Sequence, residues 1–259
     1  MMSPSALAAT RLALRTRAPL IHNITSAVAA NFTANVLLAL GASPAMVESD
    51  DEVEEFVALS DALVINLGSR TVQRSAIMLK AAEAAKRTVS LWVLDPVGVG
   101  AIEPRNALAR VLCELGPTAI RGNASEILGL VGEDGQGRGV DTGLGSDQAI
   151  GAARRLARST GAIVAVTGAV DYVTDGNEVL SVAHGHPMMT RVTGMGCAAT
   201  AIVAACLAVQ PDRLRAVAQA LTITGIAGEI AASRAAGPGS LAMHYLDALA
   251  GDIQALPDR

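Results

Sequence analysis

Short apolar runs alternate along the chain with longer stretches of mixed polarity. The clearest runs predict strands over residues 62–66, 89–94, 119–121 and 163–167, each followed closely by Gly, Asp or Pro. Between them, residues 72–86 and 147–159 place apolar side chains at three- and four-residue intervals, as amphipathic helices do. This alternation indicates βαβ units, so we expect an α/β fold with a mostly parallel central sheet flanked by helices.

The last third of the chain follows a different pattern. Residues 172–174 and 178–182 flank an Asp-Gly-Asn turn at 175–177, which predicts a β-hairpin at a sheet edge. After Gly196, Ala-rich stretches predict three helices, over residues 197–209, 212–236 and 240–253. The C-terminal third is therefore expected to be helical.

Composition adds limits to this picture. Hydrophobic residues make up 51% of the 259 residues and aromatic residues only 2%, so Ala, Val, Leu and Ile must fill the core. We expect one domain over residues 1–259, although length alone does not exclude two smaller ones. The net charge is −4 and no run of Lys and Arg is present, which argues against nucleic-acid binding.

Two uncharged or Gly-rich segments need separate interpretation. Residues 26–47 carry no charge before position 48, but polar residues, Gly41 and Pro44 interrupt them, which favours a buried helix and a turn over a membrane span. Residues 132–145 are rich in Gly and are expected to form a mobile loop. Three cysteines at spacings that match no zinc motif, and no secretory signal, indicate a reducing, cytoplasmic location.

A Gly-containing turn at residues 193–197 leads directly into an apolar helix. Gly194 and Gly196 let a ligand approach the backbone, and the first N–H groups of a helix stabilise an anion such as a transferred phosphoryl group. Cys197 begins the helix, where the dipole should favour the thiolate and make it a candidate proton acceptor. An ordinary helix start with a buried, inert cysteine would give the same pattern.

Carboxylates follow two predicted strands. Asp95 comes directly after one strand, and Asn123 and Glu126 lie one helical turn apart after another. The carboxyl edge of a parallel sheet is where α/β proteins bind ligands, and oxygen donors suit Mg²⁺ with a phosphate. A turn at Asp95 and a capping box from Asn123 to Glu126 are the structural alternatives.

Further polar residues accompany apolar segments elsewhere in the chain. Thr167 and Gly168 follow the strongest strand and suit contact with a nucleotide. Asn23 could contact a polar substrate, whereas its neighbour His22 is interpreted as a loop histidine with satisfied hydrogen bonds. The sequence lacks the P-loop, the dinucleotide-binding Gly motif, the Gly-x-Ser-x-Gly elbow and the His-Glu-x-x-His motif. These absences argue against a P-loop kinase, a classical dehydrogenase and a serine hydrolase.

In combination these segments resemble the hydroxyethylthiazole kinase family. The resemblance rests on PLIHNIT at 19–25, GASPAM at 41–46, DPVG at 95–98, RGNASE at 121–126, TG at 167–168 and TGMGC at 193–197. They occur in the family's order from about residue 19 to residue 239. The resemblance implies a ribokinase-like fold, a homotrimer with active sites between subunits, and transfer of the ATP γ-phosphoryl group to 5-(2-hydroxyethyl)-4-methylthiazole, with Mg²⁺.

The resemblance also implies roles for individual residues. Substrate positions are Met46, Gly194 and Asn23; ATP positions are Arg121, Thr167, Gly168 and Asn123; acidic positions near magnesium are Asp95 and Glu126; and the catalytic group is Cys197 with Gly194 and Gly196. Cys197 stands where many ribokinase relatives carry a catalytic aspartate, and as a thiol it would be a weak base at neutral pH. Met195 departs from the small residue usual between the two glycines, so its side chain must point away from the phosphoryl group.

Two rival functions stay open at this point. One is a kinase of the same fold acting on another heteroaromatic alcohol, such as a hydroxymethylpyrimidine or a pyridoxal-like compound. The other is a catalytically silent nucleotide-binding trimer that regulates a partner and binds ATP without acceptor-dependent release of ADP.

Overall fold

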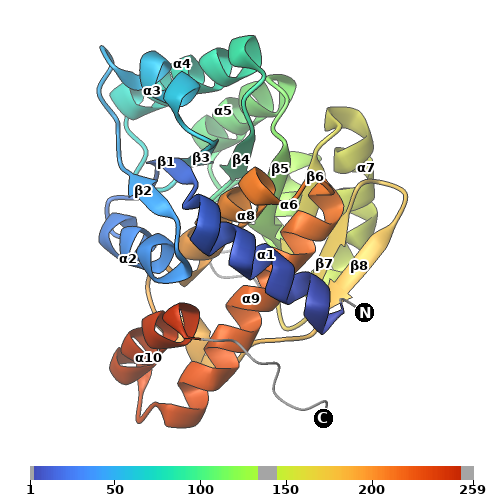
Figure 1. Ribbon diagram of the computed structural model, residues 1–259. Helices are drawn as coiled ribbons and strands as arrows, with labels where there is room; N and C mark the ends of the chain where they lie inside the picture. Colours follow the sequence, from blue (N-terminus) through green and yellow to red (C-terminus); the bar gives the residue numbers. More distant parts are fainter. Residues whose placement is uncertain (1–2, 134–144, 252–259) are drawn as a thin grey trace.

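A mostly parallel sheet forms the centre of the computed structural model, which describes residues 3–133 and 145–251 (Figure 1). The strands are β1 Leu20–Ile24, β2 Ser43–Ala45, β3 Ala62–Asn66, β4 Trp92–Asp95, β5 Ala119–Asn123, β6 Ile163–Thr167, β7 Asp171–Thr174 and β8 Val179–Val182. Their order across the sheet is β2-β1-β3-β4-β5-β6-β7-β8. Strands β1 to β6 pair in parallel, whereas β7 and β8 are antiparallel.

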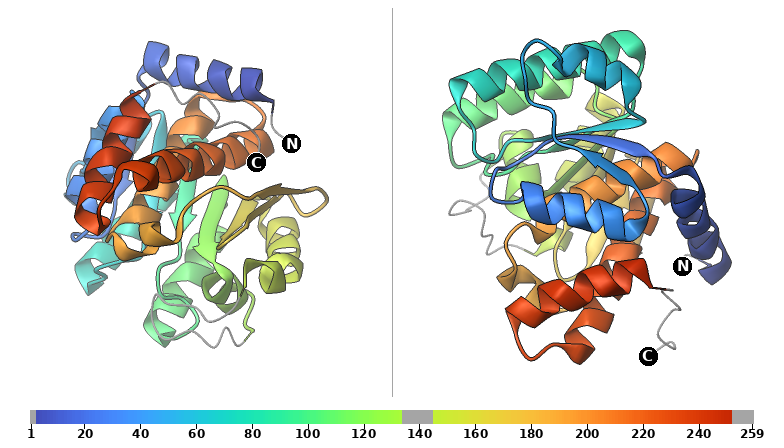
Figure 2. Two further views of the ribbon diagram at one scale, coloured as in Figure 1. Left: turned by 90° about the horizontal axis from the view of Figure 1, so that it is seen from below. Right: turned by 60° about the vertical axis from the view of Figure 1, so that its left-hand side comes forward.

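Helices cover both faces of the sheet (Figure 2). The helices are α1 Pro4–Arg17, α2 Ala30–Leu40, α3 Val53–Leu59, α4 Val72–Thr88, α5 Glu103–Glu114, α6 Ala124–Leu130, α7 Ile150–Thr160, α8 Met195–Val209, α9 Arg213–Arg234 and α10 Pro238–Ala250, with 3₁₀ turns η1 Ser146–Ala149 and η2 Pro187–Arg191. Helices α1, α2, α8, α9 and α10 bury one face of the sheet. Helices α3 to α7 bury the other, so the sheet is apolar on both sides as parallel sheets are.

Strands β3 and β6 have the predicted bounds, but the strand expected from residue 89 begins only at Trp92. Val89 instead ends α4 in the left-handed region, with φ 55°, and is 87% exposed. The apolar pattern could not reveal this helix cap. Strand β1 was not predicted because two polar residues, His22 and Asn23, interrupt its apolar run; His22 therefore lies in a buried strand and the loop interpretation is wrong.

The helical last third and the hairpin are confirmed. Gly176 has φ 97° in the turn between β7 and β8, and β8 lies at the sheet edge. By length and composition α9 could cross a membrane, but 78% of its apolar window is buried inside the fold, as in a core helix. Most of the loop predicted at 132–145, and the predicted helix end at 253, lie outside the described residues. That residues 1–259 form one domain stays a prediction.

Candidate active site

Four polar residues stand near the carboxyl ends of neighbouring parallel strands and share one face of the sheet. They are Asn66, Asp95, Arg121 and Thr167, on β3, β4, β5 and β6. In each strand, the residue two positions earlier belongs to the core on the face that α8 covers; these residues are Val64, Val93, Ala119 and Ala165. Because side chains alternate along a strand, the four polar residues point to that same face. Strand order and alternation thus gather polar chemistry beneath the start of α8.

Asp95 is the buried carboxylate of this group, with 1% of its surface exposed. Its Oδ2 accepts hydrogen bonds from Asn66 Nδ2 at 2.7 Å and from Thr200 Oγ1, on α8, at 2.8 Å. Its Oδ1 is buried and has no hydrogen-bond partner among the described residues. Burial raises the pKa of Asp95, while the positive charge of Arg121 and the two hydrogen bonds act in the opposite direction.

Arg121 is the cation of the site. Its Nη2 donates to Thr167 Oγ1 at 2.8 Å, which joins two of the predicted ATP positions. Its charge also acts on the carboxyl groups of Asp95 and Glu126 and on the Cys197 thiol. Arg121 therefore links the predicted nucleotide positions to the acidic pair.

Glu126 and Asn123 form the capping box at the start of α6. Glu126 Oε2 accepts from the Asn123 backbone N–H at 2.9 Å, and Oε1 accepts from the Gly98 backbone N–H at 3.0 Å. Burial, followed by the nearby charge of Asp95, raises the pKa of Glu126 to about 7. The capping box, which was the structural alternative for this motif, is therefore present. The charge of Asp95 also acts on the same carboxylate, so capping does not exclude a role in the acidic site.

The Gly-rich turn forms the N-terminus of α8. Gly194 is the N-cap residue, with φ 86°, and Met195 begins the helix with its side chain 7% exposed within the core. The side chain of Met195 is therefore removed from the turn, as the predicted anion site requires. The Met195 N–H donates to Val192 O at 3.4 Å, whereas Gly196 and Cys197 lie in the first turn, where N–H groups have no partner within the helix and can bind phosphate.

Cys197 lies within electrostatic reach of Asp95 and Arg121, whose charges both act on its thiol. Burial, with a further contribution from Asp95, raises the pKa of its thiol to about 12. The expectation that the helix start would favour the thiolate is therefore wrong: desolvation and the adjacent carboxylate outweigh the dipole. The other two cysteines are core residues: Cys206 is fully buried on the face that α8 covers, and Cys113 packs, partly buried, against the cluster on the other face.

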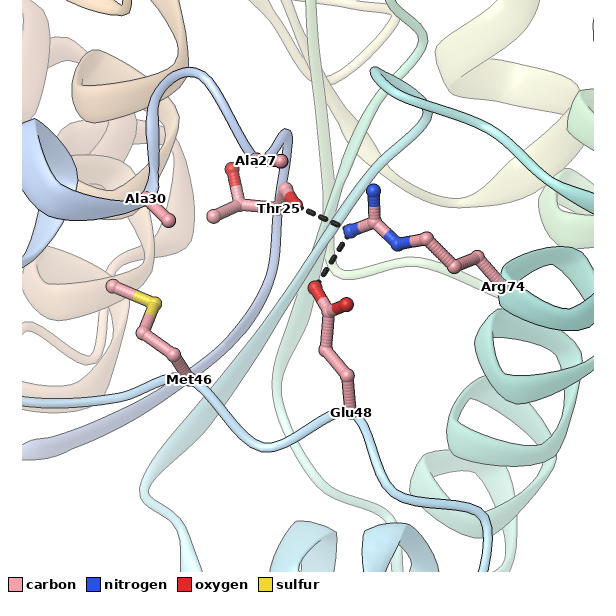
Figure 3. Close-up of a pocket in the computed structure, with 6 residues that line it drawn as sticks. All are labelled: Thr25, Ala27, Ala30, Met46, Glu48 and Arg74. Atoms are coloured by element: carbon pink, nitrogen blue, oxygen red, sulfur yellow. Dashed lines mark hydrogen bonds and ion pairs between the residues drawn. The ribbon is translucent and has the colours of Figure 1, made fainter.

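A pocket of about 270 Å³ lies beside the Gly-rich turn at the start of α8 and is drawn in Figure 3. Its lining residues are Thr25, Ala27, Ala30, Met46, Glu48 and Arg74. Met46 and the two alanines provide an apolar wall. Arg74 Nη2 donates to Glu48 Oε1 at 2.6 Å and to the carbonyl oxygen of Thr25, which makes the opposite wall polar. An apolar wall opposite a polar one suits a small heteroaromatic molecule.

The turn and the pocket meet at the start of α2. A Cβ atom on Gly194 would lie 3.2 Å from Ala29 Cβ, immediately before the pocket residue Ala30. Asn23 is fully buried in β1; its Nδ2 donates to Ile21 O, and its Oδ1 has no partner among the described residues. It is not one of the six lining residues. His22 Nε2 is paired with Val47 O at 2.8 Å, on the other face of the strand.

The site fits a magnesium ion held jointly with phosphate. Across residues 3–133 and 145–251 there is no group of three or more His, Cys, Asp or Glu residues that could hold a metal without other ligands. Mg²⁺ usually takes only one or two carboxylates and fills its shell with water and substrate phosphates. The unpartnered Oδ1 of Asp95 and the charge that Asp95 exerts on Glu126 suit that arrangement.

Gly168, the remaining predicted site residue, has a structural partner as well. The Gly168 backbone N–H donates to Asp171 Oδ1 at 2.9 Å, so Gly168 is anchored at the start of β7. Sequence reasoning missed Asn66, Thr200, Arg74 and Glu48. A signal existed for two of them: Asn66 ends an apolar strand as Asp95 does, and Thr200 lies three residues after Cys197 on one helix face.

The fold itself has known counterparts. The structure superposes with a TM-score of 0.63 on a ribokinase-like superfamily protein from Enterococcus faecalis V583, at 11% identity, covering 89% of this chain and 86% of the other. At that identity the likeness concerns the fold alone. The protein therefore has a ribokinase-like α/β fold, with an eight-stranded, mostly parallel sheet covered by helices on both faces.

Closer relatives define the family. The family model described as "Hydroxyethylthiazole kinase family" matches residues 12–254 of this chain. Hydroxyethylthiazole kinase from Granulibacter bethesdensis is 57% identical over 236 residues, which cover 91% of this chain and 86% of that protein. The structure of a hydroxyethylthiazole kinase protein from Pyrococcus horikoshii OT3 has a TM-score of 0.88 at 40% identity, covering 95% of this chain and 93% of the other. The chain belongs to the hydroxyethylthiazole kinase family.

Proposed function

We propose that this chain transfers the γ-phosphoryl group of ATP to the primary hydroxyl of 5-(2-hydroxyethyl)-4-methylthiazole, giving 4-methyl-5-(2-phosphooxyethyl)thiazole and ADP in thiamine salvage. One observation carries the proposal beyond family membership. The helix start that suits a transferred phosphoryl group adjoins both the buried Asp95–Arg121 site and the Met46 pocket. Donor and acceptor subsites therefore meet at the point where the phosphoryl group must move.

The nucleotide lies along the carboxyl ends of β5 and β6 in this proposal. Arg121, Thr167, Gly168 and Asn123 contact ATP, with Arg121 providing positive charge toward the phosphates. Support comes from the pairing of Arg121 with Thr167 and from the closeness of its guanidinium to the start of α8. Arginine is suited to this role because its planar fork of donors matches phosphate oxygens.

The reaction is an in-line displacement at the γ-phosphorus. The acceptor oxygen forms a bond to phosphorus, the bond to the bridging oxygen of ADP breaks, and the hydroxyl proton leaves to solvent or phosphate. Backbone N–H groups of Gly194, Gly196 and Cys197 stabilise the charge on the phosphoryl oxygens, while the N–H of Met195 donates to Val192 O. Cys197, with its thiol pKa raised to about 12, orients the hydroxyl as a neutral thiol.

Magnesium belongs to the same proposal. Asp95 and Glu126 would hold it, together with phosphate oxygens and water, and the ion would neutralise charge on the β- and γ-phosphates. Support comes from the unpartnered Oδ1 of Asp95 and from the like-charge influence of Asp95 on Glu126, which an added cation would relieve.

The thiazole ring lies in the pocket, against Met46. The orphan oxygens of Asn23 and Thr25 are buried acceptors near the same end of β1 and suit a polar substrate or a bound water. We further propose a homotrimer with active sites between subunits and a cytoplasmic location. Val28, just before α2, and Leu38, on α2, are apolar side chains that are 73% and 61% exposed, which is consistent with a subunit interface. Three unpaired cysteines are consistent with the proposed location.

Acceptor-dependent ADP release tests the function directly. Purified protein with MgATP is given 5-(2-hydroxyethyl)-4-methylthiazole, a hydroxymethylpyrimidine, pyridoxal or no acceptor. Turnover with the thiazole alone is the expected result. Turnover with another acceptor would keep the reaction and replace the substrate, and ATP binding without any turnover would favour the regulatory alternative.

Two substitutions connect the activity to the acidic residues. Asp95→Ala and Glu126→Ala should impair use of MgATP far more than binding of the thiazole, measured by steady-state kinetics and by calorimetry with the thiazole. An equal loss of both would contradict the roles proposed for these residues.

A further inference from the structure

Two donors converge on one oxygen of Asp95 and leave the other oxygen free. Asn66 Nδ2 and Thr200 Oγ1 lie 2.7 Å and 2.8 Å from Oδ2. Oδ1 is buried without a partner among the described residues. A carboxyl group rotates readily about its terminal torsion, so two hydrogen bonds on one oxygen fix which oxygen faces the site.

The orientation of the Asn66 amide is set by a third group. The Gly68 backbone N–H can only donate, and it lies 2.8 Å from Asn66 Oδ1. The amide oxygen must therefore face Gly68, and the NH₂ group must face Asp95. Asn66 is fully buried, so solvent offers no alternative partner.

Thr200 acts from the opposite side, on α8. Its hydroxyl has one proton and two acceptors within reach: Asp95 Oδ2 at 2.8 Å and the Gly196 carbonyl oxygen, on its own helix, at 3.3 Å. The shorter distance and the charge of the carboxylate favour Asp95. Thr200 is fully buried and therefore ties the strand that carries Asp95 to the helix that carries the Gly-rich turn.

We propose that Asn66 and Thr200 are positioning residues that hold Asp95 by one oxygen and present the other to the metal and phosphates. The proposal rests on the proposed function, since it deepens the account of the same site. In this proposal neither residue touches the reacting atoms, and both act through Asp95.

Thr200→Val tests the second donor because it removes a hydroxyl at nearly constant shape. We expect kcat to fall about tenfold, from the loss of one hydrogen bond to a charged acceptor. Calorimetry should show a similar loss in the affinity for ADP with Mg²⁺, no change for ADP without Mg²⁺, and an unchanged KM for the thiazole. Thr200→Ser restores the hydroxyl and should restore these values.

Thr222→Val is the matched control. Thr222 is a buried threonine on α9 whose hydroxyl donates to Ala218 O at 2.9 Å, on its own helix. Its substitution removes a buried helix hydroxyl of the same kind and should leave the kinetic constants and both ADP affinities unchanged. The thermal midpoints of all variants show whether a loss follows from unfolding.

Asn66→Asp provides a second measurement that does not depend on Thr200. The side chain keeps its shape and its acceptor for Gly68, but the donor to Asp95 is replaced by an acceptor. We expect kcat and the affinity for ADP with Mg²⁺ to fall more than for Thr200→Val, because a second negative charge meets Asp95.

Wild-type turnover distinguishes a failure of the proposed function from a failure of the positioning role. If wild type fails to phosphorylate the thiazole, the proposed function is wrong. If wild type is active while Thr200→Val and Asn66→Asp change only the thermal midpoint, or change both ADP affinities equally, the positioning role is wrong.

Discussion

The guanidinium of Arg121 occupies the space where a side chain on Gly196 would begin. A Cβ atom built on Gly196 would lie 2.9 Å from Nη1 of Arg121, and Nη2 of the same group donates to Thr167 at 2.8 Å. Gly196 is not among the residues with positive φ, so its backbone conformation does not require glycine. The glycine is needed because the cation lies so close to the start of α8.

Gly196→Ala should therefore weaken ATP binding while leaving the fold intact. The added methyl group displaces the guanidinium from the helix start, and we expect KM for ATP to rise about tenfold. Stability should stay equal or increase slightly, since alanine is favoured over glycine within a helix. Steady-state kinetics and thermal unfolding measure the two effects.

Gly239→Ala is the control for this substitution. Gly239 is the second residue of α10, as Gly196 is of α8, and a Cβ atom there would meet nothing within 4 Å. Its substitution should leave the kinetics unchanged. A similar rise in KM for both variants would mean that the contact with Arg121 is not the cause.

Sequence reasoning found the residues whose signal is local. Asp95, Arg121 and Thr167 each end or follow an apolar run, so a strand end with a polar residue marked them, and the parallel sheet then brought them together. Asn66 ends an apolar strand in the same way and Thr200 shares a helix face with Cys197, but only their hydrogen bonds to Asp95, between elements far apart in the chain, distinguish them from an ordinary turn residue and an ordinary core threonine.

Two errors have the same physical origin. Strand β1 was missed because His22 and Asn23 are polar, and their partners become known only when the strand is placed in the sheet. The thiol of Cys197 was expected to ionise readily from its place at a helix start, whereas burial and Asp95 raise its pKa to about 12. Local sequence indicates a helix start but not the degree of desolvation around it.

Arg74→Met should affect the thiazole more than ATP. Arg74, on α4, donates to the carbonyl oxygens of Gly68 and Ser69, after β3, and to the carboxylate of Glu48, after β2. It therefore ties α4 to both of these loops beside the pocket. Its loss leaves Glu48 unpaired in the pocket wall, and we expect KM for the thiazole to rise about tenfold with KM for ATP changed less than about threefold.

The control lies on the same helix. Arg87 pairs with Glu54 at the surface and is 58% exposed, so Arg87→Met should leave both KM values unchanged. Equal increases in the two KM values of Arg74→Met would instead indicate a general disturbance of the site.

Glu126 should make the protein less stable as pH rises. Its pKa is raised to about 7 in the folded protein, from an ordinary value of 4.5. A raised pKa means that the folded state binds the proton more tightly than the unfolded state does. The stabilisation is present below pH 4.5 and is lost as pH rises toward about 7, by roughly 1–3 kcal/mol.

Glu126→Gln removes this titration and allows the effect to be isolated. Glutamine cannot accept from both backbone N–H groups, so a constant loss of stability is expected as well. The difference in free energy of unfolding between wild type and variant, measured without metal from pH 4 to 8, should move in favour of the variant as pH rises. A constant difference would contradict the raised pKa; Glu55→Gln, at an exposed glutamate on α3, is the control.

Cys197 should act as a neutral thiol, and the pH dependence of kcat tests this. With a pKa near 12, very little thiolate exists at neutral pH. If catalysis required the thiolate, kcat would rise about tenfold for each pH unit between 6 and 9. We expect no such rise, and we expect Cys197→Ser to keep kcat within about tenfold of wild type, since a hydroxyl can also orient the acceptor. Cys197→Asp supplies the opposite case: if the group at this position accepts the proton, a carboxylate should shift the limiting ionisation to lower pH. A steep wild-type rise that disappears in Cys197→Ser and moves downward in Cys197→Asp would establish the thiolate as the base.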